Sequence, residues 1–294
     1  MIIDSWVLGC WTPELRKAYL EHPLTRRFMK VFRLEGEDRV PSKTVEQMVE
    51  EMENTGIDKA VLVGDSPFKP AVSYGPSIPP SFGTYEQWSK FADKYPDKFV
   101  VCATPSRPGY WDVRQTVREV ERAVKDFHAQ AINIPSPAWN LPFNSKLLYP
   151  VYSKCVELGI SIWIWVGIPG PYYPVKVAQV IFLDEIALAF PELKIVAHHI
   201  GDPWIQMVTH LAGKYENLYI CTCAWSPRWY PSELVNFMKT SWFGTRGSEK
   251  VLFGTAYPVL PWKRAVEEAL ALPLEDEDKR KFLGENALKL FHWG

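Results

Sequence analysis

The residues best suited to acid–base chemistry lie near position 200, where the chain reads IVAHHIGDPW over residues 195–204. An imidazole has an ordinary pKa close to neutral, so it can move protons at physiological pH once a neighbour fixes its tautomer. Side chains alternate along a strand, and alternation with the preceding apolar residues directs His199 inward and His198 outward to the helices. We predict His199 as the acid/base and Asp202 as the carboxylate that orients it. Asp202 followed by Pro203 also has the sequence of a helix start, with Asp202 as the N-cap.

Two cysteines offer a second chemistry. Cys221 and Cys223 are two residues apart in an apolar stretch, so on a strand they share one face, which we expect to point inward. Their side chains would stand roughly 6–7 Å apart, too far for a disulfide. Three interpretations stay open: small residues that fill the interior, a nucleophile, or a soft-metal site shared with His199 or Asp202.

Hydrophobic periodicity predicts the scaffold that must position these residues. We expect strands near residues 2–7, 59–64, 98–103, 130–134, 160–166, 193–199, 217–223 and 250–254. Helical patterns lie between them, near 42–55, 84–95, 111–127, 144–158, 175–190, 203–213, 231–240 and 261–270, and a last helical pair covers 275–291. Alternating strands and helices imply parallel pairing, and eight such units predict a single (β/α)8 TIM barrel over residues 1–294 with extra C-terminal helices. The alternative is an open doubly wound sheet, which is weakened because no glycine-rich nucleotide turn follows a predicted strand.

The connections differ at the two ends of the predicted strands. Helix-to-strand connections are short and polar, whereas strand-to-helix connections are longer and hold many of the Pro, Trp and Tyr residues, at 67–83, 105–110, 135–143, 167–174, 224–231 and 257–262. A barrel carries its chemistry on the face where its strands end, so we expect an aromatic-walled cleft there. Segment 9–40 is a cap-like insertion after the first strand, and its Arg33 is a candidate partner for a substrate carboxylate. The simpler interpretation of its arginines is a solvated basic surface.

Composition and charge exclude several classes of protein. The 294 residues are 47% hydrophobic and carry a net charge of −1, which argues against nucleic acid or an anionic membrane as a partner. The longest apolar run is far below the ~18–20 residues of a membrane helix, and the first residues lack the features of a signal peptide. Five scattered cysteines, an odd number, favour a reduced, cytoplasmic protein.

Three stretches carry a resemblance to a known family. They read IIDSWVLG at residues 2–9, VLFGTAYP at 251–258 and LGENALKLF at 283–291. These stretches resemble segments of the amidohydrolase-related family that includes aminocarboxymuconate semialdehyde decarboxylase and the resorcylate-type decarboxylases. The resemblance implies a TIM barrel and the chemistry of C–C cleavage or hydrolysis. It also implies a divalent metal held by two His of the first strand, one His of the fifth strand and one Asp of the eighth.

The positions that match those ligands carry other residues in this chain: Trp6, Leu8, Trp165 and Ala256. None of these side chains offers a lone pair suited to zinc or manganese, so we predict that the metal has been lost. Ala256 is either native or an engineered replacement of Asp or Asn. Asp4 shares the predicted inward face with Trp6, and we expect it either to hold hydrogen bonds in the barrel floor as a structural residue or to act as a buried proton holder. The resemblance also implies that His199, in its H-x-G-D element, is the family's catalytic acid/base.

Together these observations favour a metal-independent lyase of the decarboxylase type, which acts on a planar or aromatic carboxylic acid through His199 and needs no cofactor. The predicted substrate contacts are Trp6, Leu8, Trp165, Cys223, Ala256, Tyr257 and Arg33. Two alternatives stay open: a metal-free hydrolase of a lactone or activated ester, and a non-catalytic barrel that binds flat apolar ligands. The expected partner is a small organic acid, and the family resemblance implies a homodimer.

Overall fold

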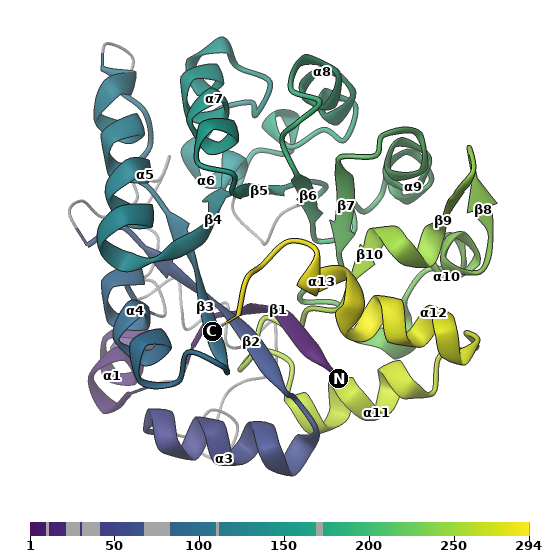
Figure 1. Cartoon of the computed structure of the whole chain (residues 1–294), viewed down its shortest axis with the longest axis horizontal. Coiled ribbons are helices and arrows are strands. Elements are labelled where there is room, and N and C mark those ends of the chain that lie inside the picture. Colours follow the sequence, from purple (N-terminus) through teal and green to yellow (C-terminus); the bar gives the residue numbers. More distant parts are fainter. Residues whose placement is uncertain are drawn as a thin grey trace.

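Eight parallel strands form one sheet in the order β1-β2-β3-β4-β5-β6-β7-β10 (Figure 1). The computed structural model describes residues 1–9, 12–21, 30, 42–67, 83–109, 112–168 and 173–293. The strands are β1 Ile3–Val7, β2 Lys59–Asp65, β3 Phe99–Thr104, β4 Ala129–Ile134, β5 Ser161–Trp165, β6 Ile195–His198, β7 Leu218–Cys221 and β10 Val251–Leu252. The Leu8 amide donates to the Tyr257 carbonyl and the Ala256 amide to the Trp6 carbonyl, each at 2.9 Å. These bonds join β1 to the segment after β10 and close the barrel.

Helices surround the barrel (Figure 1). They are α1 Pro13–Glu21, α3 Val45–Thr55, α4 Tyr85–Lys94, α5 Val113–Phe127, α6 Ser136–Trp139, α7 Tyr149–Glu157, α8 Phe182–Ala189, α9 Ile205–Lys214, α10 Ser232–Lys239, α11 Trp262–Leu270, α12 Asp276–Arg280 and α13 Asn286–Leu288. Single turns lie at Lys146–Leu148, Val175–Val177, Pro227–Trp229, Gly247–Lys250 and Lys281–Glu285, and a small hairpin pairs β8 Ser241–Trp242 with β9 Thr245–Arg246.

Local sequence explains where two of the outer helices begin. Thr44 and Gln47 form a reciprocal capping box at the start of α3, and Thr84 and Gln87 form another at the start of α4. In each pair the two side-chain oxygens accept hydrogen bonds from two backbone N–H groups that a helix N-terminus otherwise leaves unpaired. These caps fix the first helical turns that follow the long connections of β1 and β2.

The buried apolar side chains form two clusters, one inside the barrel and one between the strands and the helices. The inner cluster consists of Ile3, Trp6, Val61, Val63, Val100, Cys102, Ala131, Trp163, Val196, Cys221, Cys223, Leu252, Ala256, Ala287, Leu290 and Phe291. On β2 and β3 its members are two residues apart (Val61 and Val63, Val100 and Cys102), and the intervening Leu62 and Val101 belong to the larger outer cluster between strands and helices. The interior is therefore filled by side chains, as expected for a packed barrel.

The C-terminal segment covers one end of this interior. Phe291 contacts the Trp163 ring, with centroids 5.8 Å apart, and the His292 amide donates to the Gln130 side chain at the start of β4. In Figure 1 the yellow segment after α13 crosses the barrel, and the C-terminus lies beside β2 and β3. The tail thus seals the end where the strands begin and leaves the opposite end for the site.

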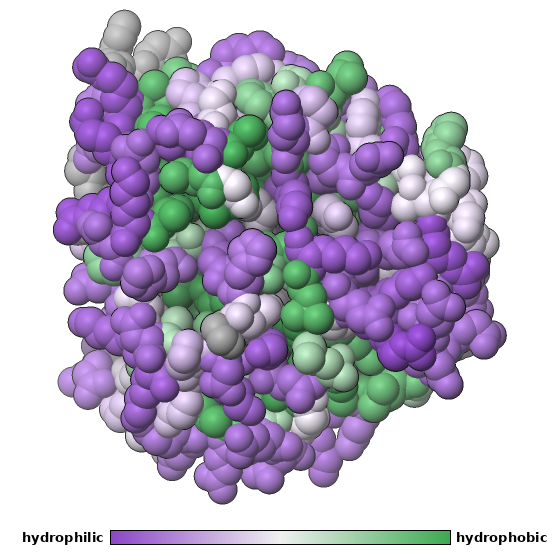
Figure 2. Space-filling view, viewed as in Figure 1, coloured by the Kyte–Doolittle hydropathy of each residue, from purple (hydrophilic) through white to green (hydrophobic). Residues whose placement is uncertain are grey.

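The fold prediction is confirmed: all eight predicted strands are present and parallel. The predicted insertion at 9–40 contains helix α1, but Arg33 lies outside the described residues. Within the described part of the chain, no helix has the length and apolarity required to cross a membrane. The face shown in Figure 2 is mostly hydrophilic, with apolar patches between the polar side chains.

Candidate functional site

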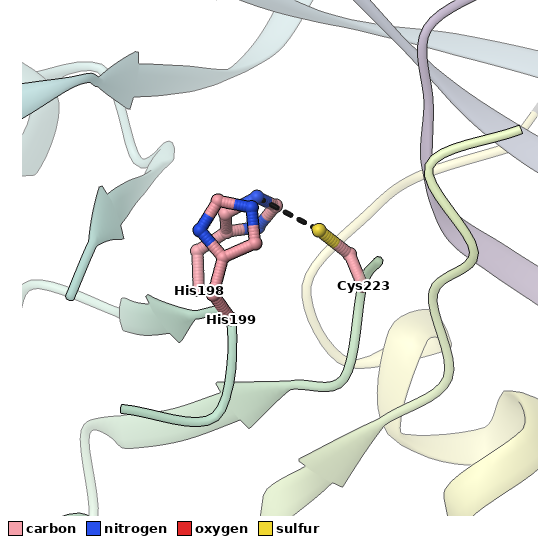
Figure 3. Close-up of side chains that lie close together, drawn as sticks. All are labelled: His198, His199 and Cys223. Atoms are coloured by element: carbon pink, nitrogen blue, oxygen red, sulfur yellow. Dashed lines mark hydrogen bonds between the residues drawn. The ribbon is translucent and has the colours of Figure 1, made fainter. Parts of the chain in front are cut away.

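Two consecutive histidines lie side by side where β6 ends. His198 is the last residue of the strand, and His199, Ile200 and Gly201 follow with φ angles of 71°, 55° and 72°. Left-handed backbone is uncommon for residues other than glycine, and it concentrates at functional sites. The turn places both imidazoles on one side of the backbone, with ring centroids 3.8 Å apart (Figure 3).

The His198 ring lies at the end of the barrel interior. It has no exposed surface, its centroid is 3.9 Å from that of Trp6, and its Nε2 is 2.8 Å from the Sγ of Cys223 (Figure 3). Its Nδ1 is buried and has no hydrogen-bond partner among the described residues. Burial, followed by the neighbouring His199, lowers the pKa of His198 well below its ordinary value, so this ring is neutral at physiological pH.

His199 is half-buried and closer to the outside than His198. Its ring meets that of Trp165 edge-on, with centroids 5.4 Å apart. Burial lowers the pKa of His199 from 6.5 to about 3, because desolvation disfavours the charged imidazolium. The free protein therefore presents two neutral imidazoles among indole rings.

The predicted orientation of His198 is wrong. Val196 belongs to the inner cluster and Ala197 to the outer one, so alternation points His198 into the barrel. His199 reaches the same place for a different reason: it lies past the strand, where the left-handed turn swings its ring over its neighbour. Sequence reasoning thus found one histidine of the pair and assigned the other to the helix layer.

The cysteines face inward, as predicted. Cys221 and Cys223 both belong to the inner cluster, and both are buried and free. Burial raises the pKa of the Cys223 thiol well above its ordinary value, so Cys223 and His198 meet as a neutral thiol and a neutral imidazole. A thiol of this kind is not an activated nucleophile, since the thiolate is the reactive form.

Aromatic side chains form the walls next to the histidines. Trp6 is buried against His198 and stacks on Trp163 at 5.5 Å. Trp165 lies parallel to the His198 ring, with centroids 6.1 Å apart. Leu8 and Ala256 belong to or contact the inner cluster. Tyr173, which sequence reasoning missed, lies 6.4 Å from Trp165, and burial followed by nearby Asp65 raises its pKa to about 12.

A divalent metal of the kind the family resemblance implies does not fit these walls, because the side chains of Trp6, Leu8, Trp165 and Ala256 carry no metal-ligating atom. One other group of ligand types exists among the described residues: the ligand atoms of His198, His199 and Cys223 lie within 4.8 Å of one another. Two ligands of a tetrahedral zinc ion, one sulfur and one nitrogen, are about 3.5 Å apart. The 2.8 Å between Cys223 Sγ and His198 Nε2 is shorter and corresponds to a hydrogen bond.

Asp202 does not have its predicted position. Helix α9 begins at Ile205 with Trp204 at its N-cap, so the prediction of Asp202 as N-cap is wrong. The left-handed turn delays the helix by several residues. Among the described residues, the group formed by the two histidines and Cys223 does not include the Asp202 carboxylate. Its backbone carbonyl instead accepts a hydrogen bond from the Ile168 amide at 2.7 Å, which ties this turn to the one after β5.

Tyr257 is also placed away from the histidines. It belongs to the outer cluster, stacks on Trp262 of α11 with centroids 3.8 Å apart, and donates from its hydroxyl to Glu51 of α3 at 2.6 Å. Its neighbour Ala256 is left-handed, with φ 56°, and faces the inner cluster, so the next side chain turns outward. The prediction that Tyr257 contacts substrate is not supported by this position.

Asp4 is structural, as predicted, but its side chain points the other way. Ile3 and Trp6 both face inward because the register of β1 shifts between Asp4 and Val7. Asp4 consequently points to the helix layer, where its carboxylate accepts hydrogen bonds from Trp262 Nε1 and the Thr255 amide. A bulge of this kind is not visible in the sequence.

Comparison with known proteins adds a family and a set of structural relatives. A model of the amidohydrolase family matches residues 27–293, whereas no curated protein matches the chain. An uncharacterized TIM-barrel protein from Bordetella bronchiseptica is 24% identical, with 98% of this chain and 97% of that chain covered and a TM-score of 0.76.

Two decarboxylases have the same fold. The 5-carboxyvanillate decarboxylase of Novosphingobium aromaticivorans, solved with manganese and 4-hydroxy-3-methoxy-5-nitrobenzoic acid, is 17% identical, with 99% and 95% coverage and a TM-score of 0.68. The 2,6-dihydroxybenzoate decarboxylase of Rhizobium is 16% identical, with 99% and 98% coverage and a TM-score of 0.65, and a structure of such an enzyme holds 2,6-dihydroxybenzoate. These likenesses establish the fold, and the family model covers most of the chain. The protein belongs to the amidohydrolase family.

Proposed function

We propose that this protein is a lyase that removes the carboxyl group of a planar aromatic acid, with His199 as acid/base and without a metal at the family's usual position. The observation that carries the proposal is the pair of neutral imidazoles at the end of β6, enclosed by Trp6 and Trp165. Family membership supports the reaction class, since several relatives of the same fold act on or bind aromatic acids.

The absence of the family's metal is part of the proposal. The resemblance of β1, β5 and the segment after β10 to the family's metal-binding strands assigns the ligand positions to Trp6, Leu8, Trp165 and Ala256. These side chains are mostly hydrocarbon and carry no atom that coordinates a divalent metal ion. Elemental analysis of purified protein tests this assignment, and chelators are expected to leave activity unchanged.

Binding relies on the walls of the site. Indole rings offer flat, apolar surfaces on which a substituted benzene ring stacks. Trp6, Trp165, Leu8, Cys223 and Ala256 are the proposed contacts on the barrel side. Arg33 stays a proposed partner for an anionic group of the substrate.

The proton reaches the substrate through His199. In the free protein this imidazole is neutral, with its pKa lowered to about 3. A carboxylate bound nearby favours the charged form and raises that pKa, so the complex takes up a proton from solution. The imidazolium then gives this proton to the ring carbon that bears the carboxylate. The bond from that carbon to the carboxyl carbon breaks, its electron pair returns to the ring, CO2 leaves, and His199 is neutral again.

The test is CO2 release from a panel of hydroxybenzoic acids. We expect turnover by the wild type and a loss of at least about 100-fold in His199→Ala, which is typical of removing a general acid. His210→Ala is the matched control, because His210 stacks on the hairpin residue Trp242 at 4.3 Å. Full activity in His199→Ala overturns the proposal, and tight binding without any product identifies a binding protein.

Hydrolysis of an uncharged lactone is a second candidate, because the neutral form of His199 is the form of an imidazole that can accept a proton. A neutral imidazole can accept a proton from water. An uncharged substrate does not raise the pKa of His199 as a carboxylate does, so the imidazole stays neutral in the complex. Formation of a hydroxy acid from a lactone, without CO2 release from the carboxylic acids, identifies this activity.

A further inference from the structure

We infer that Cys223 holds His198 in the tautomer with its proton on Nδ1, and that this N–H and the indole N–H of Trp165 form a pair of neutral donors for a carboxylate. This pair of donors would bind the substrate carboxylate in the reaction proposed above, so its catalytic role rests on that proposed function. The two nitrogen atoms, Nδ1 of His198 and Nε1 of Trp165, have no partner among the described residues. Their protonation and their binding of a carboxylate can be measured without turnover.

The contact between Cys223 and His198 sets the tautomer. Sγ and Nε2 are 2.8 Å apart, and neither residue has exposed surface. Burial raises the pKa of the thiol and lowers that of the imidazole, so both groups are neutral. Thiol sulfur is a weak acceptor, whereas the bare nitrogen of a neutral imidazole is a good one. The hydrogen bond therefore runs from S–H to Nε2.

A neutral imidazole carries one proton, so acceptance at Nε2 places that proton on Nδ1. Nδ1 is buried and has no partner in the part of the chain that the structure describes. Buried donors in native proteins are nearly always hydrogen-bonded to protein or to an ordered small molecule. We infer that the partner of this N–H is a bound ligand.

Trp165 supplies the second donor. Its Nε1 is buried and equally without a partner among the described residues, and indole nitrogen only donates. Trp165 and His198 are register partners on the neighbouring strands β5 and β6, and their rings lie nearly parallel at 6.1 Å. Two unpaired N–H groups on register partners of adjacent strands are as many donors as one carboxylate has oxygen atoms, and we infer that they bind one carboxylate together.

Neutral donors suit a reaction in which the carboxylate becomes CO2. A cation would hold the negative charge most strongly before the reaction and lose that interaction as the charge moves into the ring. Donors without charge stabilise the bound carboxylate less and so favour its departure. Neutral donors also leave the negative charge of the substrate uncompensated. His199 lies next to His198, with ring centroids 3.8 Å apart, and it is therefore the group that takes up a proton to balance this charge.

The first test reads the tautomer directly, by long-range 15N–1H NMR of the full-length protein at pH 7, with the His198 signal assigned through His198→Gln. We expect the Nδ1–H form in the wild type, its retention in Cys223→Ser, where a hydroxyl still donates, and its loss in Cys223→Ala. An Nε2–H form in the wild type, or an unchanged Nδ1–H form in Cys223→Ala, overturns the inference.

The second test measures binding of 2,6-dihydroxybenzoate and of 2,6-dihydroxybenzamide by calorimetry. Trp165→Phe keeps a ring and removes the N–H, and we expect it to weaken binding of the carboxylate about tenfold more than binding of the amide. Trp163→Phe is the matched control, because the Trp163 indole already donates to Ser161 at 3.1 Å. Equal losses for both probes, or no binding of the carboxylate to the wild type, overturn the donor pair. Selective binding without CO2 release leaves the donor pair standing and removes the proposed function instead.

Discussion

The indole of Trp262 donates a hydrogen bond to the carboxylate of Asp4 at 2.7 Å, and so joins the first strand to the helix that follows the last one. The same carboxylate accepts the Thr255 amide at 2.9 Å and the Thr255 hydroxyl. Asp4 has no exposed surface, and burial raises its pKa to about 6 despite these donors. The two ends of the barrel sheet are therefore held by one buried acid.

Replacing this acid by its amide should destabilise the protein. In Asp4→Asn an NH2 group faces donors, so at least one buried donor loses its acceptor. We expect the free energy of unfolding to fall by about 1–3 kcal/mol at pH 7, measured by urea denaturation. An unchanged unfolding free energy would show that the carboxylate is not a structural junction.

The pH dependence of that loss follows from the raised pKa. The folded protein holds the Asp4 proton more tightly than the unfolded chain does, so this group's contribution to stability is full below pH 4 and declines as pH rises toward 6. The asparagine variant lacks this titration. The difference in unfolding free energy between the two proteins should shrink from pH 4 to 6, and a difference that grows over this range contradicts the assignment.

His199 should behave in the opposite sense. Its pKa is lowered from 6.5 to about 3 by burial, so the unfolded chain binds the proton more tightly. The contribution of His199 to stability is full above pH 6.5 and is lost as pH falls toward 3. We therefore expect acid to destabilise the wild type more than His199→Asn between pH 6.5 and 4. NMR titration of the His199 ring with a midpoint near 6.5 would refute this prediction.

The turn that carries the histidines depends on Gly167. This residue has φ 85°, and a Cβ there would lie 2.5 Å from the carbonyl oxygen of Asp202. Gly159 also has positive φ, 67°, but no atom within 4 Å of such a Cβ. We expect Gly159→Ala to cost about 1 kcal/mol of stability from strain alone, and Gly167→Ala to cost clearly more. Thermal unfolding of both variants checks this, and equal losses would show that the close approach is not important.

Trp6 should contribute strongly to the stability of the protein through its packing inside the barrel. It is 2% exposed and contacts both His198 and Trp163. Trp6→Ala leaves a large cavity, and we expect a loss of about 3–5 kcal/mol in the free energy of unfolding. Trp229→Ala is the control, because Trp229 is 65% exposed and its truncation should change stability by less than about 0.5 kcal/mol. A Trp6 variant as stable as this control would contradict the described packing.

The strands were predictable because each is a compact apolar run between polar turns, but the direction of side chains on β6 was not. Parallel strands of a barrel are buried on both faces. Val196 and Ala197 are both apolar, so the sequence carries no alternation that assigns one of them to the interior. Packing in the folded barrel places Val196 on the inner face, and His198, two residues later, points the same way.

Backbone irregularities explain the other differences. The register shift in β1 separates the faces of Asp4 and Trp6. The left-handed residues after β6 delay helix α9 and move Asp202 out of the cap position. Left-handed Ala256 turns Tyr257 to the outer layer. Such features are determined by contacts distant in sequence, which local pattern does not encode.

The central claim is that His199, neutral in the free protein and next to indole rings, takes up a proton with the substrate and transfers it without a bound metal. Its most direct measurement is the rate of CO2 release from hydroxybenzoic acids by protein whose metal content has been reduced to a negligible level and verified by elemental analysis. We predict full activity in this protein and loss of activity in His199→Ala. Activity that disappears on metal removal and returns with added manganese or zinc would contradict the claim.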